Sequence, residues 1–204
     1  MTLTVNPLLH GTLSGQTGGA DSVRTNLALY EALTDTFAEA TIQAATLDHG
    51  IPVIISIKTE PDHWFVEEGI SSALQRMGYP SYNDSAVVPP NAVKFEVMPV
   101  FSVSYDDVFR DGMFGTKRVH RNASAAFAYQ IVEKGTGKII AGGNSTKQYS
   151  DVIRMDDISS LENNGIRSTH AEVPTDSFFD RVVEPFVIIG AAGTAVYLFF
   201  HVRS

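Results

Sequence analysis

Cysteine is absent from this chain of 204 residues, and basic residues are in the minority. Without thiols there can be no disulfide, thiolate zinc site, iron–sulfur cluster or cysteine nucleophile, and no lipid-modified N-terminal cysteine. Lys and Arg number 15 against 23 Asp and Glu, which gives a formal charge of -8. Nucleic acid is therefore excluded as a partner of the whole chain, because phosphate binding needs a positive field.

A basic n-region and a long apolar core are also missing from the N-terminal residues, so they do not read as a signal peptide. We interpret 1–20 as a loose segment, 21–150 as a globular α/β domain, 151–181 as a connector and 182–204 as a membrane anchor. Two compartments stay open for the domain. It is cytoplasmic if no signal peptide is removed, and it lies outside the cytoplasm if one is.

Charge is absent from residues 185–202, which would rise about 27 Å as a helix, close to the thickness of a bilayer core. This pattern predicts one transmembrane helix with the lipid bilayer as a partner, and the alternative is a core helix of a soluble protein. The anchor residues that we single out are Pro185, Phe186, Ile189, Gly190, Gly193, Val196, Leu198 and Phe200.

The sequence of the globular domain predicts an α+β fold with a mixed sheet. An apolar stripe indicates a helix over about 21–45, an apolar run at 53–57 indicates a buried strand, and a second helix with Trp64 on its buried side should follow. Alternating residues in 93–105 and 119–131 predict long strands, joined to a third at 139–149 by a hairpin around 134–138. The result is a strand–helix unit followed by a three-stranded antiparallel meander.

Residues that could carry chemistry do not form a recognisable constellation, and we predict no catalytic residue, metal or cofactor. The Gly-Thr-Gly-Lys run at 135–138 lacks the Ser or Thr of a phosphate loop. His63 and Glu67 lie in the first turns of a predicted helix, where a capping role is expected because acidic residues are favoured there. Asp151, Asp156 and Asp157 are expected on a solvated face. The basic residues at 117–121, including Arg121, are expected on a solvated strand face. The alternative function is a small membrane-associated hydrolase that uses His63, or His120 facing Asp106 or Asp107 across the sheet.

Exposed apolar residues in a loop often mark a binding surface. The turn between the first two meander strands carries Phe109, Met113 and Phe114. We predict that these three residues contact a protein partner, with packing over the sheet as the alternative.

Two elements resemble a bacterial envelope group of accessory lipoproteins, which includes penicillin-binding-protein activators and curli-secretion channel subunits. They are the helix at 64–79, from Trp64 to Gly78-Tyr79, and the strand–Thr-Gly-Lys–strand hairpin at 126–142. The resemblance covers about residues 50–150. It implies a non-enzymatic subunit that docks onto or helps assemble a larger envelope complex, and it favours the periplasm. The group normally carries a lipidated N-terminal cysteine, for which the C-terminal helix would substitute here.

Overall fold

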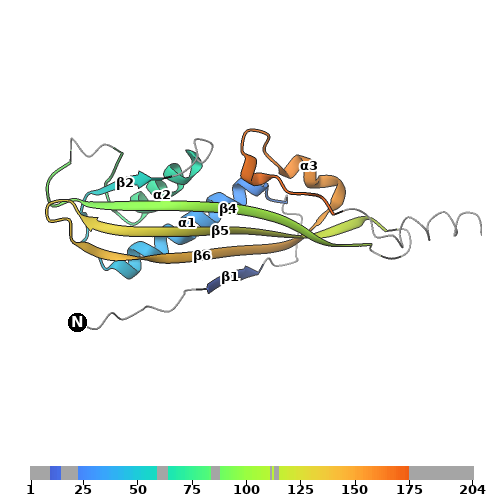
Figure 1. Cartoon of the computed structure of the whole chain (residues 1–204), viewed down its shortest axis with the longest axis horizontal. Coiled ribbons are helices and arrows are strands. Elements are labelled where there is room, and N and C mark those ends of the chain that lie inside the picture. Colours follow the sequence, from blue (N-terminus) through green and yellow to red (C-terminus); the bar gives the residue numbers. More distant parts are fainter. Residues whose placement is uncertain are drawn as a thin grey trace, which may run out of the picture.

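The described part of the chain forms one mixed sheet, with two long helices packed on one of its faces (Figure 1). The computed structural model describes residues 10–14, 23–58, 64–83, 88–110, 112 and 115–174. The strand order is β1-β6-β5-β4-β2-β3. The strands are β1 (His10–Ser14), β2 (Val53–Ile57), β3 (Ser81–Tyr82), β4 (Val93–Arg110), β5 (Lys117–Glu133) and β6 (Ile139–Arg154).

The predicted meander is confirmed, because β4, β5 and β6 pair antiparallel in chain order. The predicted strand–helix unit is confirmed as β2 and α2 (Trp64–Arg76), and β2 pairs in parallel with both β4 and β3. The sequence did not indicate β1, which adds to the other edge in parallel with Thr146–Ser150 of β6.

Helix α1 (Asn26–Ala45) begins and ends at threonines. The Thr25 side chain accepts a hydrogen bond from the Ala28 N–H at 3.2 Å, which satisfies one of the free amides of the first turn. Thr46 takes the left-handed conformation, with a φ of 48°, and ends the helix. The N-cap therefore lies four or three residues after the predicted Asp21 or Ser22.

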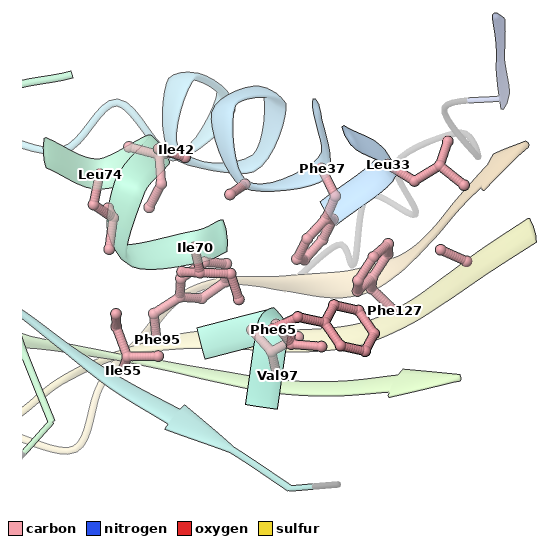
Figure 2. Packing of buried hydrophobic residues seen from close by; sticks show 14 of the residues in the cluster. Leu33, Phe37, Ile42, Ile55, Phe65, Ile70, Leu74, Phe95, Val97 and Phe127 are labelled. Carbon is pink, nitrogen blue, oxygen red and sulfur yellow. The ribbon is translucent and has the colours of Figure 1, made fainter. Parts of the chain in front are cut away.

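The main core lies between α1, α2 and the inward residues of β4 and β5 (Figure 2). Phe37 of α1 stacks on Phe127 of β5, with ring centroids 4.0 Å apart and planes within 2°. On α2 the buried residues include Phe65, Val66 and Ile70. The prediction for Trp64 was wrong: this side chain is 57% exposed, because the residues after it turn inward.

Residues 155–174, which we name the C-terminal segment, fold back over the far end of the same sheet face. The segment contains η2 (Met155–Asp157), α3 (Ile158–Leu161) and η3 (Arg167–Thr169). Ile158 and Leu161 pack against Val103, Val119 and Ile153 in a second apolar cluster. The described part of the expected connector is therefore packed onto the domain.

The predicted anchor, residues 182–204, lies outside the described residues, as do all eight side chains singled out there. Among the helices that the structure does describe, none is both long enough and apolar enough to span a bilayer. The transmembrane helix therefore stays a prediction.

Candidate interaction surface

The face of β4, β5 and β6 that points away from the helices forms a broad surface, which we name the open face. Alternation along β4 places Met98 and Val100 there, and these side chains are 51% and 62% exposed. Their cross-strand partners on β5 are Ala128 and Ala126. Small alanines beside two exposed apolar side chains give this part of the sheet a shallow apolar surface.

A charged cluster borders the apolar patch at one end. The Glu96 carboxylate lies 2.5 Å from the Lys94 ammonium and accepts a hydrogen bond from the Gln130 amide at 2.5 Å. Lys58 approaches it at 3.9 Å. Lys94, followed by Gln130, lowers the pKa of Glu96. A hollow of about 200 Å³ lies between this cluster and Met98.

A row of short polar side chains borders the patch at the other end and crosses three strands. Ser104 of β4, Asn122 of β5 and Ser150 of β6 stand in register. Asp106 accepts hydrogen bonds from Ser104 and from the Asn122 amide, both at 3.1 Å, and Asn122 accepts one from Ser150 at 2.6 Å. These bonds hold the side chains against the sheet, so the surface keeps a defined polar pattern.

The β4–β5 hairpin projects beyond the helices (Figure 1). A register shift between Asp106 and Phe109, with Asp107 at a φ of 51°, bends the strand there. Phe109 is 37% exposed and its ring lies 5.4 Å from that of His120. Met113 and Phe114 lie outside the described residues. The predicted partner surface at this tip stays a prediction.

Of the two predicted partners of His120, Asp106 and Asp107, it is Asp106 that pairs with it in register across β4 and β5. Both side chains are exposed, and the ring of His120 packs on Phe109. Asp106 directs its carboxylate to Ser104 and Asn122. His63, the other candidate, lies outside the described residues.

Arg121 contradicts the expectation that the basic residues at 117–121 share a solvated face, because its side chain is fully buried. It donates two hydrogen bonds to the Asp151 carboxylate, from Nε at 2.9 Å and from a terminal nitrogen at 2.6 Å. Its other terminal nitrogen donates to the Arg24 carbonyl at 2.8 Å and to Asn26 at 3.0 Å. The sequence contained a signal for this burial, because Arg121 is an odd-numbered residue of β5, like the inward-facing Ala123 and Phe127.

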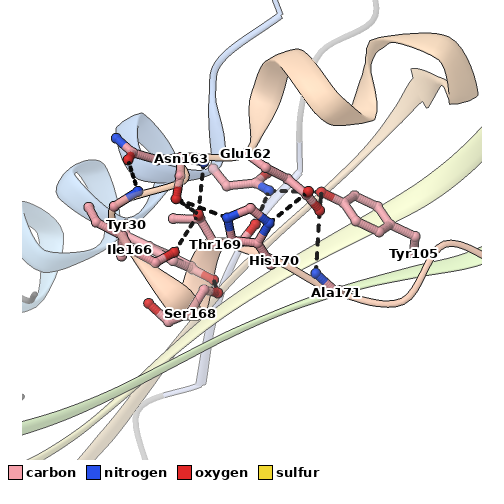
Figure 3. A network of polar contacts seen from close by, with 11 residues as sticks. Tyr30, Tyr105, Glu162, Asn163, Ile166, Ser168, Thr169, His170 and Ala171 are labelled. Atoms are coloured by element: carbon pink, nitrogen blue, oxygen red, sulfur yellow. Dashed lines mark hydrogen bonds and ion pairs between the residues drawn. The ribbon is translucent and has the colours of Figure 1, made fainter.

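Asn26 extends this buried network to the C-terminal segment, whose Glu162, Thr169 and His170 are shown with Tyr105 in Figure 3. Its amide nitrogen donates to the Tyr105 hydroxyl and to the Thr169 carbonyl, both at 2.8 Å. Tyr105 in turn donates to Glu162 at 3.3 Å, and Glu162 also bonds His170 at 2.9 Å. Burial raises the pKa of Tyr105, so the phenol stays neutral and able to donate. The network joins the start of α1, the sheet and the C-terminal segment, which is a structural role.

A cleft of about 400 Å³ runs between α1 and α2 and is acidic. Glu31 and Asp35 of α1 and Glu68 of α2 line it. Burial, followed by the charge of Glu68, raises the pKa of Glu31. Asp35 is paired with Arg76 of α2, which ties the two helices together at this point.

No group of three or more His, Asp or Glu suitable for a metal ion occurs within the described ranges. Glu67 bonds the side chain of Asn83. Of the three aspartates expected on a solvated face, Asp151 pairs with the buried Arg121 and is only 19% exposed, which corrects that expectation. Asp156 is 79% exposed and lies 4.0 Å from Arg154.

No protein-family model matches the sequence, and no curated protein matches it either. Among solved structures, the chain is similar to a neuraminyllactose-binding hemagglutinin homologue from Helicobacter pylori, at 18% identity and a TM-score of 0.29. That alignment covers 52% of this chain and 63% of the other, less than two thirds of its length. It is also similar to a lipoprotein from Neisseria meningitidis, at 13% identity and a TM-score of 0.29, with 71% and 99% of the two chains covered.

Proposed function

We propose that this chain is a non-enzymatic binding or assembly subunit of a larger bacterial envelope complex. Residues 182–204 hold it at the membrane, and its open face and hairpin tip contact another protein subunit. The observation that carries the proposal is the exposure of Met98 and Val100, at 51% and 62%, on a sheet face with no described cover. Antiparallel sheets usually turn polar residues to water on an uncovered face.

The surroundings of the two side chains support a protein partner. Burying Met98 and Val100 against an apolar surface would release water from both side chains. The charged cluster at one end of the patch and the row of short polar side chains at the other would set the orientation of the partner. Ala126 and Ala128 beside them leave space for side chains of the partner. The contacts of His120 and Asp106 are with neighbours in the sheet, and they favour this binding role over a hydrolase.

Co-purification of the full chain from detergent tests the proposal. Val100→Lys places a charge in the centre of the patch, and we expect it to release a partner that the unaltered chain retains at constant stoichiometry. Gln43→Lys, on the exposed side of α1, makes a similar change far from the sheet and should retain the partner. Recovery of the unaltered chain without any other protein would refute the assembly role.

The anchor needs a separate test, because it rests on the absence of charge in residues 185–202. We expect the chain to stay in the membrane pellet after a carbonate wash and to leave it only with detergent. Release by carbonate alone would refute the anchor and support the soluble alternative, while leaving the open face as a binding surface.

A further inference from the structure

The C-terminal segment lies at the hairpin end of the sheet, where α3 and the β4–β5 hairpin are close together (Figure 1). Ala171 packs against the same apolar cluster as Val108, at the base of the hairpin, and its N–H donates to Glu162 at 3.3 Å. Glu162 also accepts a hydrogen bond from the Tyr105 hydroxyl. The last part of the described chain is therefore held beside Tyr105, in the half of β4 that ends in the hairpin.

The chain from Ala171 to residue 182 limits where the proposed anchor can begin. A stretch of 11 residues spans at most about 38 Å when fully extended. The hairpin end is near, because Phe109 lies four residues beyond Tyr105 along β4, about 13 Å away. Val93, at the other end of β4, lies 12 residues from Tyr105, about 40 Å away. The tether therefore reaches a bilayer at the hairpin end with ease, and one at the other end only at or beyond full extension.

Four basic side chains surround the hairpin end, and we name them the basic collar. Arg110 pairs in register with Lys117, and Arg118 pairs in register with Arg154. Alternation along the strands places Arg118 and Arg154 on the open face and the other pair on the opposite face. Like charges that stand opposite each other in a ladder lower the stability of the sheet. Phosphate groups facing both pairs would offset this repulsion.

Acidic residues also lie close to the basic collar. Asp156 is 79% exposed and lies 4.0 Å from Arg154, so water screens this pair. Asp106 and Asp107 precede the hairpin, and Asp111 lies outside the described residues. This end of the sheet therefore carries no strong net charge, and the contact that it suits is local. Guanidinium groups bind individual phosphate groups, and they do so through two parallel hydrogen bonds.

The other described faces of the domain suit phosphate groups less well. The helical face carries the acidic cleft, where Glu31, Asp35 and Glu68 would repel them. The open face presents the apolar patch that the proposed function assigns to a protein partner. The hairpin end combines closeness to the tether with a set of cations opposed across the ladder.

We propose that the basic collar docks on the phosphate groups of the bilayer that holds residues 182–204. The hairpin end then faces the membrane, and the β5–β6 turn points away from it. This inference rests on the membrane anchor of the proposed function. The short tether keeps the collar near the lipid headgroups, so the collar has a high effective concentration there without tight binding by any single side chain. A protein subunit that meets the hairpin tip then lies at the membrane as well.

The absence of cysteine allows single fluorescent labels on the full chain. Thr116→Cys places a label at the hairpin end, and Ile139→Cys places one at the other end of the sheet; both positions are exposed. The labelled chains are reconstituted into vesicles of phosphatidylethanolamine and phosphatidylglycerol with a quencher on the lipid headgroup. We expect the label at residue 116 to lose its fluorescence and the label at residue 139 to keep it. Equal quenching of the two labels, or stronger quenching at residue 139, overturns the proposal.

A change of charge tests the basic collar separately from the tether. Arg118→Gln combined with Arg154→Gln removes two cations, and we expect the ratio of docked to undocked chains to fall about thirtyfold. Lys58→Gln combined with Lys138→Gln removes two exposed cations at the other end of the sheet and should leave the ratio unchanged. Circular dichroism checks that both variants fold. An arginine double variant that folds and is quenched at residue 116 as strongly as the parent overturns the proposal.

A carbonate wash of the same vesicles distinguishes failure of the anchor from failure of the docking. If the unaltered chain leaves the vesicles in carbonate, the anchor is refuted and the docking, which depends on it, is refuted with it. If the chain stays and the label at residue 116 keeps its fluorescence, only the docking is refuted.

Discussion

Removal of the Arg121 side chain should destabilise the domain more than any other single change to a polar residue of the buried network. Arg121 is fully buried and donates to Asp151, Asn26 and the Arg24 carbonyl. Arg121→Met keeps most of the volume but leaves these acceptors without their donor. Breaking a buried ion pair by removing one partner costs about 3–5 kcal/mol. Asp151 is 19% exposed, and water can reach it, so we expect the lower end, about 3 kcal/mol.

Urea unfolding followed by far-UV circular dichroism measures this loss. With a slope of about 2 kcal/mol per molar urea, the midpoint should fall by about 1.5 M. Trp64 is a poor reporter for the experiment because it is already 57% exposed in the folded state. A loss below about 1 kcal/mol would refute the reasoning, since it would mean that the orphaned acceptors find water at no cost.

The double variant Arg121→Met, Asp151→Leu separates the cost of an orphaned charge from the loss of packing. Replacing both members of a buried pair by apolar residues is often close to neutral. We therefore expect the double variant to recover a substantial part of the stability lost in Arg121→Met. If the free-energy losses of the two single variants simply add in the double variant, the ion pair is not the source of the destabilisation.

Two further changes test the core and the charged end of the open face. Phe37→Ala removes the ring stacked on Phe127 at 4.0 Å. The free energy of unfolding should fall by about 3–5 kcal/mol in the same urea assay. A loss under about 1 kcal/mol would show that the site collapses to fill the cavity. Glu96→Gln removes a carboxylate whose pKa is lowered mainly by Lys94, and then by Gln130. A carboxylate whose pKa is lowered by folding stabilises the protein at pH values above its pKa in the unfolded chain. This stabilisation is lost as the pH falls through its pKa in the folded state. The variant should therefore be less stable at pH 7 by up to about 1 kcal/mol and equal to the parent near pH 3, and a difference that grows on acidification would contradict the assignment.

Local sequence patterns predicted the long elements of this fold, but not the short strands β1 and β3 or their pairings. Period-two alternation in β4 and β5 depends on one buried face, and the chain keeps it from Val93 to Asp106 in β4 and from Val119 to Ala128 in β5. β1 has only five residues and pairs with a strand more than 130 residues later, so no local signal marks it. The burial of Ile158 and Leu161 was missed for a similar reason, because the segment that carries them reads as polar.

The candidate site shows the same division between local and distant information. The sequence indicated that His120 faces Asp106 or Asp107, since a hairpin register follows from neighbouring strands, and the structure selects Asp106. It did not indicate the exposure of Met98 and Val100, because alternation names two faces without saying which one the helices cover. Arg121 was misplaced because residue type was given more weight than parity, although a buried arginine needs several distant partners that no local pattern shows.

The length of the meander strands sets a distance within the protein. β4, β5 and β6 contain 18, 17 and 16 residues, whereas most strands are about 5–6 residues long. At about 3.3 Å per residue, the β5–β6 turn and the β4–β5 tip are held roughly 50–60 Å apart. The three strands pair along most of their length and resist bending except at the register shift between Asp106 and Phe109, so the sheet largely fixes the separation of its two ends. A partner bound at one end and a support at the other would keep a fixed separation, which side-chain changes along the face would leave unchanged.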